Sequence, residues 1–485
     1  MKSNRISFRG TSSIPRWVLL VATLGFLHAC AASMHSSEMH GLKSQLVGSE
    51  NRNALKNLES QVFSDPKAAE PKFRESPDPI SMMELGAIYS HMGEFENSNR
   101  VLEKVFQIYN AQEERAIISL TQTSTQVGEA TLSEGMGEYQ LANYEKVLLH
   151  AIKAMNHLLL GNPEGARVEI SRAYIRQSLI KQYSDLEAAR AQANLEDETQ
   201  KAANNLGQTY SNSFAPDNLI KEANLNTEEL AAIQHVRRSY ENAYIEVLSS
   251  IIYNLNSELD NSLPPLRRAV EITGNPFVSA QLSQLEHLQN GSPVENSNLS
   301  VFIHEGYAPE KVSFPIIFPN PITGAINKIS LAKYVPQPSP VARAVLLDSR
   351  GREIGDIAEL DLIDALAFKD YEEKLPARIA KALSRLIVQS IKDYILRDQM
   401  GSMGTLMGSM MNLIVENADT RTWTLLPKRI RYFSGRVSDS QVHISLRNQQ
   451  GTEIFGYDIP VSRDTATLVS VRALGDKTFL QYIAY

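Results

Sequence analysis

Apolar positions recur at helical spacing in the first half of the chain and at strand spacing in the second. From Ser76 to His287, large apolar side chains follow one another three or four residues apart, with hardly any strand-like alternation. After Asn298 the chain changes to short β-branched and aromatic runs broken by Gly, Pro and Asn. We therefore expect an α+β protein of two domains, all-helical over residues 73–290 and β-rich over residues 291–485.

The clearest helical unit runs from Met82 to Val105. Large side chains line one face of a first helix, Gly86 leaves room for a partner helix, and Gly93 makes the turn into the second helix. This spacing is typical of the tetratricopeptide repeat (TPR), a helix-turn-helix unit whose apolar face is buried only when neighbouring units stack. The pattern predicts one such unit here.

Two further units are predicted from Val147 to Arg176 and from Ala243 to Ile272. In the last one, Pro264 and Pro265 fall inside the second helix, so we expect that helix to start later or to be broken there. Together the units predict a small TPR-like solenoid. A plain helical bundle without a groove gives much of the same periodicity, and the polar, alanine-rich segment 182–204 favours an extended helix.

The second half contains short runs typical of strands, separated by turn residues. Asp348–Gly351 and Asn448–Gly451 predict hairpin turns, so we expect an antiparallel sheet or sandwich. The predicted strands are Leu299–His304, Lys311–Phe318, Lys328–Tyr334, Val341–Asp348, Arg429–Phe433, Gln441–Leu446, Glu453–Ile459, Ala466–Val471 and Phe479–Ile483.

A helical insertion over about residues 361–418 interrupts the strands. Pro376 suits a first helical turn, and an apolar stripe at helical spacing follows it as far as Ile395. The next segment, Met400–Val415, is rich in Met and Gly. A core helix packed by flexible methionines is favoured for it over a membrane-touching or oligomerising segment.

The first thirty residues have the layout of a lipoprotein signal. A basic stretch precedes the apolar run Trp17–Leu27, and Cys30, the only cysteine, follows it. This run is short of the roughly 20 residues that a membrane span needs. We therefore expect residues 1–29 to be a signal peptide, Cys30 to carry lipid, and residues 30–72 to form a flexible tether. Ala31 after the cysteine favours the outer membrane, with the protein facing the periplasm.

Charge and composition narrow the function classes. Removal of the four basic signal residues changes the formal net charge from -7 to -11, which argues against nucleic acid as a partner. With Cys30 acylated, no thiol remains for a disulfide, a cysteine metal site or a cysteine nucleophile. We therefore predict no metal and no cofactor.

Motifs for catalysis are missing from the sequence. It has no serine nucleophile elbow, no Gly-rich phosphate loop and no zinc helix. Ser330 and Lys333 match Ser-x-x-Lys but fall in a predicted strand. His157 is interpreted as a repeat-core residue, and Asp361 and Asp364 are expected in a solvated turn. The protein is therefore predicted not to be an enzyme.

Five phrases together resemble one uncharacterised family of bacterial outer-membrane lipoproteins. The phrases are Gly93–Glu103, Tyr144–His150, Leu158–Arg167, His304–Pro309 and Thr420–Pro427. The resemblance covers nearly the whole mature chain. It implies a TPR-like N-terminal half, a C-terminal domain without assigned activity, and gene proximity to a lipoprotein activator of penicillin-binding proteins.

These features predict a lipid-anchored periplasmic scaffold whose helical groove binds a protein or peptide. Aromatic side chains carry much of the energy of interfaces, so Tyr89, Tyr144, Tyr174 and Tyr253 are the candidate groove residues, and each is equally suited to a core. One alternative is a regulator of peptidoglycan synthesis, which the resemblance suggests through its gene neighbourhood. Another is an envelope hydrolase.

Overall fold

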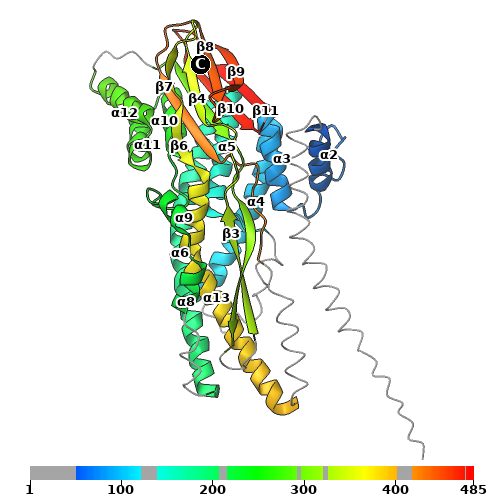
Figure 1. Cartoon of the computed structure of the whole chain (residues 1–485). Coiled ribbons are helices and arrows are strands. Elements are labelled where there is room, and N and C mark those ends of the chain that lie inside the picture. The colour runs from blue at the N-terminus through cyan, green and yellow to red at the C-terminus, as the bar shows by residue number, and fades with distance from the viewer. Residues whose placement is uncertain are drawn as a thin grey trace, which may run out of the picture.

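Helices precede sheets in the folded chain, as the hydrophobic pattern predicts. The computed structural model describes residues 51–121, 139–206, 216–291, 297–320, 326–400, 418–475 and 477–485. Helices make up the described chain as far as residue 291, and strands dominate after residue 297 (Figure 1). The α+β class is therefore confirmed. Lipid attachment at Cys30 and the Met- and Gly-rich segment from residue 401 lie outside the described residues.

The chain is already folded before the expected end of the tether at residue 72. Helix α2 (Asn51–Val62) packs beside α3 (Pro79–His91), and the side chains of Leu58, Val62 and Phe63 are buried. A bridge between Phe63 and Phe73 closes the intervening loop. Residues 51–72 therefore correct the tether prediction, because their few apolar side chains find a partner in α3.

Successive helices pack as pairs joined by short turns. Helix α3 packs on α4, α5 on α6, and α10 on α11. The remaining helices are α4 (Phe95–Thr121), α5 (Asn143–Leu159), α6 (Pro163–Leu206), α8 (Pro216–Ala223), α9 (Thr227–Ala232), α10 (Ala243–Leu255), α11 (Leu259–Ile272) and α12 (Pro276–Gln289). These pairs match the predicted units, whereas their stacking as a TPR-like solenoid stays a prediction.

Glycine conformation explains two of the turns and one close helix contact. Gly93 and Gly161 adopt φ angles of +82° and +70° between paired helices, a region that glycine occupies without strain. At Gly86, an added Cβ would lie 2.6 Å from the side chain of Leu102. The absence of a side chain at Gly86 is therefore what lets α3 approach α4.

Two helices differ from their predicted limits. Segment 182–204 does form an extended helix, but α6 is continuous from Pro163 and also serves as the second helix of the second unit. Helix α11 runs unbroken through Pro264 and Pro265, which corrects the expected break. The prolines remove the donors for the carbonyls of residues 260 and 261, which belong to exposed residues and can bond to water instead.

The strands form two larger sheets and a separate hairpin. Their orders are β11-β10-β1-β7-β6, β5-β4-β8-β9 and β2-β3, and only β1 and β10 pair in parallel among the described neighbours. The strands are β1 (Leu299–Glu305), β2 (Glu310–Pro319), β3 (Ile326–Val335), β4 (Arg343–Leu347), β5 (Glu353–Asp356), β6 (Ala358–Leu362), β7 (Arg429–Gly435), β8 (Gln441–Arg447), β9 (Glu453–Pro460), β10 (Thr467–Leu474) and β11 (Lys477–Ala484).

The two larger sheets share an apolar core. Val301 of β1 and Val469 of β10 pack in the same buried cluster as Ile444 of β8. Both predicted hairpin turns are present, with Gly351 and Gly451 each at φ +77°. The sandwich prediction therefore agrees with the shared core, although no strand was predicted at the positions of β5 and β6.

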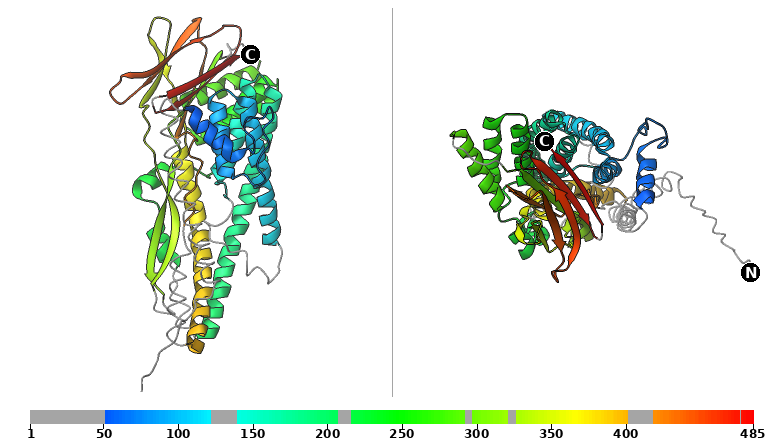
Figure 2. Two further views of the ribbon diagram at one scale, coloured as in Figure 1. Left: turned by 90° about the vertical axis from the view of Figure 1, so that its right-hand side faces the viewer. Right: turned by 90° about the horizontal axis from the view of Figure 1, so that it is seen from above.

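The helical insertion begins close to the predicted residue 361, but its helix starts well before Pro376. Helix α13 (Ile363–Met400) follows β6 directly and contains Pro376 in its interior, which corrects the placement of that proline in a first turn. The helix extends N-terminally because Ile363, Leu366 and Tyr371 are buried against the rest of the molecule. Helices α6 and α13 and the β2–β3 hairpin extend side by side from the body (Figures 1 and 2).

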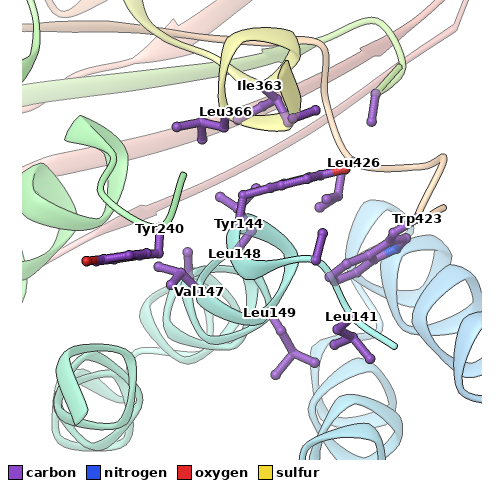
Figure 3. Close-up of a cluster of buried hydrophobic side chains, with 14 of the residues drawn as sticks. Leu141, Tyr144, Val147, Leu148, Leu149, Tyr240, Ile363, Leu366, Trp423 and Leu426 are labelled. Atoms are coloured by element: carbon purple, nitrogen blue, oxygen red, sulfur yellow. The ribbon is translucent and has the colours of Figure 1, made fainter. Parts of the chain in front are cut away.

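Helices and sheet share a second, larger core, so the expected boundary near residue 290 does not separate two cores. Figure 3 shows Tyr144 and Leu148 of α5 packed near Leu366 of α13. Trp423 and Leu426, from the segment after α13, complete this cluster (Figure 3). The C-terminal half is therefore built onto the helices through α13 and the segment 418–428.

Candidate functional site at the helix–sheet interface

A small cavity lies between the helices and the five-stranded sheet. Its volume is about 50 Å³. Since one water molecule needs roughly 10–15 Å³ of such space, the cavity has room for a few waters. Its polar lining comes from Ser90, His91, Tyr244, His304, Ser470, Arg472 and Gln481, and its apolar lining from Ala87, Ile152, Met155, Leu159, Leu425 and Pro427.

Arg472 of β10 is the central polar residue of the cavity wall. Its side chain is buried, and all five of its N–H groups have acceptors within the protein. The acceptors are Nε2 of His91 at 3.2 Å and the carbonyl oxygens of His304, Ala473, Gly306 and Leu425 at 2.9, 3.2, 2.6 and 3.1 Å. An anionic ligand would have to displace one of these bonds. The guanidinium therefore has a structural role, since it connects β10 to α3, β1 and the segment 418–428 through hydrogen bonds.

The two histidines of the cavity are held neutral. Burial, and then the charge of Arg472, lower the pKa of His304 to about 3 and that of His91 well below its usual range. Nε2 of His91 accepts a hydrogen bond from Arg472, and the hydroxyl of Tyr244 lies 3.0 Å from Nε2 of His304. Both imidazoles therefore serve as hydrogen-bonding groups of the interface across the physiological pH range.

Two buried glutamates hold the segment 418–428 against the helices, and we call this pair the carboxylate clasp. Glu84 of α3 accepts the backbone N–H groups of Thr424 and Leu425 at 2.6 and 3.0 Å. Glu145 of α5 accepts the N–H of Trp423 at 3.0 Å. Both glutamates are 0% exposed, so their side-chain oxygens depend on these hydrogen bonds rather than on water.

Aspartates of the C-terminal half in turn cap two helices of the N-terminal half. Asp361 of β6 accepts the N–H groups of Ala243 and Tyr244, the first residues of α10, at 3.2 and 2.6 Å. Asp370 of α13 accepts the N–H of Asn143, where α5 begins, at 3.0 Å. A carboxylate at a helix N-terminus satisfies unpaired donors and interacts favourably with the helix dipole.

This capping overturns one prediction. Asp361 and Asp364 are 7% and 3% exposed, so they do not lie in a solvated turn. Asp364 forms an ion pair with Lys428. Burial raises the pKa of Asp361 to about 7 even though its two backbone hydrogen bonds lower it in part. The partners of both aspartates come from distant parts of the chain, which is why local sequence gave no sign of their burial.

The four candidate tyrosines do not form a common groove. Tyr89 and Tyr144 are 4% and 0% exposed, so their assignment to a partner-binding surface was wrong. They are buried because α2 covers Tyr89 and the C-terminal half covers Tyr144. Tyr174 is half-buried and donates a hydrogen bond to Glu246 across the α6–α10 contact. Tyr253 is half-buried on α10.

An ionic network that the sequence analysis missed lies between α4, α5 and α6. His150 is buried between Tyr109, with which Nε2 makes a 3.0 Å hydrogen bond, and Glu169, which accepts from Nδ1 at 2.8 Å. Lys153 pairs with Glu169 at 2.9 Å. Burial alone would raise the pKa of Glu169, but the bonds from His150 and Lys153 lower it to about 2. His157 lies half-buried nearby on α5, in agreement with a repeat-core role.

A serine, a histidine and two carboxylates on the four-stranded sheet are not arranged for nucleophilic catalysis. His443 contacts Asp458 through Nδ1 at 2.7 Å and Glu453 through Nε2 at 3.2 Å. Ser445 donates its hydroxyl to Glu453 rather than to the imidazole. A serine triad requires the imidazole to accept the serine proton. The histidine and its carboxylates therefore form a surface ion-pair cluster.

The two side chains of the Ser-x-x-Lys match lie on opposite faces of a strand and cannot act together. Ser330 and Lys333 lie on β3, and side chains three positions apart on a strand point to opposite faces.

Within the described ranges, no group of three His, Cys, Asp or Glu side chains is placed to hold a metal ion. Nor does any helix in that part of the chain have the length and apolar character needed to cross a bilayer.

Comparisons with known proteins give no relative for this chain. No family model, no curated protein and no solved structure matches it. Functional inference therefore depends on the sequence and the geometry described above.

Proposed function

We propose that this protein is a lipid-anchored adaptor of the bacterial envelope that holds a protein or peptide partner at the outer membrane, on its periplasmic side. Support for the membrane location comes from the signal-like residues 1–29 and from Cys30 as the acylation position. Support for an adaptor comes from the buried polar groups of the interface, which form hydrogen bonds between the two halves of the chain.

The carboxylate clasp is the observation that carries the proposal. Glu84, Glu145 and Arg472 are residue types that catalytic sites use, yet here the two glutamates accept backbone N–H groups of the C-terminal half, and Arg472 donates to carbonyls of its own half and to His91 of the N-terminal half. Such bonds are costly to break because each leaves a buried polar group unpaired. They favour one rigid body that presents its outer surfaces in fixed positions.

Crosslinking in the intact envelope tests the proposal. Cells that express the full chain are treated with a membrane-permeant crosslinker, and the detergent-solubilised protein is purified under denaturing conditions. We expect at least one envelope protein to be recovered with the native chain and to be lost with Cys30→Ala, which cannot be acylated. Equal recovery with both chains, or no partner with either, contradicts an anchored adaptor.

Mass spectrometry of the purified protein tests the anchor separately. We expect residues 1–29 to be absent and Cys30 to carry acyl groups. An unmodified Cys30 with the leader still attached contradicts lipid attachment to the membrane, even if a partner is found.

A further inference from the structure

One face of the long helix α6 carries a row of apolar side chains in contact with solvent. Val168, Ile175 and Leu186 are 51%, 60% and 49% exposed, and Leu179 is half-buried. Steps of seven, four and seven residues are each close to a whole number of helical turns, so the four side chains lie on one line along the helix. We call this row the α6 seam.

The α6 seam faces away from the core of the molecule. The buried residues Ala166, Ala173 and Ile180 lie about 140° around the helix from the seam, where α6 packs on α4, α5, α10 and α13. Single apolar side chains on a surface are ordinary, whereas a continuous apolar row is typical of an interaction surface. The seam is therefore the free outer face of a helix whose inner face is already covered.

The spacing of the α6 seam is that of one helix of a coiled coil. Coiled coils repeat apolar residues at positions a and d of a seven-residue unit, which are three and four residues apart. Val168 and Ile175 fit position d, and Leu179 and Leu186 fit position a of the same register. The seam thus has the pattern of a surface that packs lengthwise against another helix.

The two polar residues in this register do not bring an unpaired charge to the seam. Arg172 and Gln182 occupy the remaining a and d positions between Val168 and Leu186. The guanidinium of Arg172 forms ion pairs with Glu103 of α4 at 2.8 Å and with Glu169 at 2.9 Å. Since its charge is balanced within the same chain, a second helix can approach without burying an uncompensated charge.

We propose that the α6 seam binds the α6 seam of a second copy of this chain, with the two helices antiparallel. When a two-fold axis passes beside residue 177, Val168 lies next to Leu186 of the second copy, and Ile175 lies next to Leu179 of the second copy. A two-fold interface requires this reciprocity, in which each residue contacts the counterpart of its own partner. The seam is self-complementary because its apolar spacing is the same in both directions along the helix.

The polar positions also favour the antiparallel arrangement. Each Arg172 then lies next to Gln182 of the second copy, whereas a parallel pair would place Arg172 next to Arg172. Beside the seam, the exposed Ser178 lies close to the two-fold axis, where its small side chain permits close approach. The arrangement therefore matches apolar with apolar side chains and avoids the contact of two arginines.

The size of the seam predicts a reversible dimer. The distance from Val168 to Leu186 along the helix is about 27 Å, or five turns. A contact of this length is smaller than a standard protein interface, and association also costs rotational and translational freedom. We therefore expect a dissociation constant on the order of micromolar rather than a permanent dimer.

Disulfide crosslinking of the purified full chain tests the arrangement. In the antiparallel pair, Val168→Cys/Leu186→Cys brings each cysteine next to a cysteine of the second copy, so mild oxidation should give a covalent dimer on a non-reducing gel. Val168→Cys alone and Leu186→Cys alone should give none. The native chain, with Cys30 as its only cysteine, is the blank. A dimer from either single variant indicates parallel pairing, and no dimer from the double variant indicates no pairing. Either result overturns the proposal.

Sedimentation equilibrium of the full chain in detergent measures the affinity without a crosslink. Ile175→Asp/Leu186→Asp should raise the dissociation constant of the dimer at least about a hundredfold, because the pair would bury uncompensated charges. The matched control is Ile317→Asp/Ile326→Asp on the β2–β3 hairpin, at positions that are 64% and 67% exposed, and it should leave the constant unchanged. Both variants should keep the native melting temperature, because all four positions are exposed. A native chain that stays monomeric, or a dimer that the seam variant does not weaken, contradicts the proposal.

Discussion

The carboxylate of Glu145 accepts the backbone N–H of Trp423 at 3.0 Å, across 278 residues of sequence. The same carboxylate accepts the N–H of Ala142 at 2.8 Å and the hydroxyl of Tyr139 at 2.6 Å. One buried glutamate thus fixes the start of α5 and the segment 418–428. The attachment of the C-terminal half to the helices depends on this side chain.

Replacement of Glu145 by alanine should therefore destabilise the whole protein. Three buried donors lose their acceptor, so we expect the free energy of unfolding to fall by about 3–5 kcal/mol. Urea unfolding followed by circular dichroism measures this loss. Glu114→Ala, which removes an exposed glutamate of α4, should change the stability by less than about 0.5 kcal/mol. A similar effect of the two substitutions would mean that Glu145 does not hold the two halves together.

Arg472 should not be replaceable by lysine. A lysine ammonium offers three donors from one point, whereas Arg472 uses five donors in a planar fork to reach four carbonyls and His91. We expect Arg472→Lys to lower the free energy of unfolding by about 2–4 kcal/mol, because buried carbonyls are left unpaired. Chemical denaturation gives the value.

The control for this substitution is Arg463→Lys. Arg463 is exposed and donates to the carbonyl of Ser438, so its replacement should be close to neutral. If Arg472→Lys is equally neutral, the guanidinium does not hold these elements together as we describe.

Much of the fold was predictable because it depends on local patterns. Strands such as Gln441–Arg447 alternate apolar and polar residues, and the turns at Gly351 and Gly451 need the positive φ angle that glycine permits. The helix pairs followed from the spacing around Gly86 and Gly93. These features depend on residues that are close together in the sequence.

The interface between the two halves could not be predicted, because it joins residues that are far apart in the sequence. Asp361 looks like a surface carboxylate until β6 places it at the N-terminus of α10, 117 residues earlier in the chain. Tyr144 looks like an interface aromatic until β3 covers it with Tyr334. Burial of these groups is decided by tertiary contacts, and a single sequence contains no signal for such contacts.

Close packing at Gly86 leads to a prediction about helix pairing. Alanine has a higher helix propensity than glycine by about 1 kcal/mol, yet its Cβ would lie 2.6 Å from Leu102. We expect the steric conflict to dominate, so Gly86→Ala should lower the free energy of unfolding by about 1–3 kcal/mol. Gly274→Ala is the control, because nothing lies within 4 Å of its added Cβ. A stabilised Gly86→Ala protein would show that α3 and α4 do not pack as described.

Asp361 should make the stability depend on pH. Burial raises its pKa in the folded protein from 3.8 to about 7. Between these values the folded protein keeps a proton that the unfolded chain has released, so the free energy of unfolding falls as the pH rises. Asparagine at this position cannot ionise, and its carbonyl oxygen can still accept the N–H of Tyr244. The stability of Asp361→Asn relative to the native protein should therefore increase by on the order of 2–4 kcal/mol between pH 4 and pH 8.

Urea unfolding of both proteins at several pH values measures this change. The comparison of Asp464→Asn, an exposed position, with the native protein should give a difference that does not vary with pH in the same way. If the difference between Asp361→Asn and the native protein is constant from pH 4 to pH 8, Asp361 does not titrate in the folded state, and its capping of α10 depends on a permanently charged carboxylate.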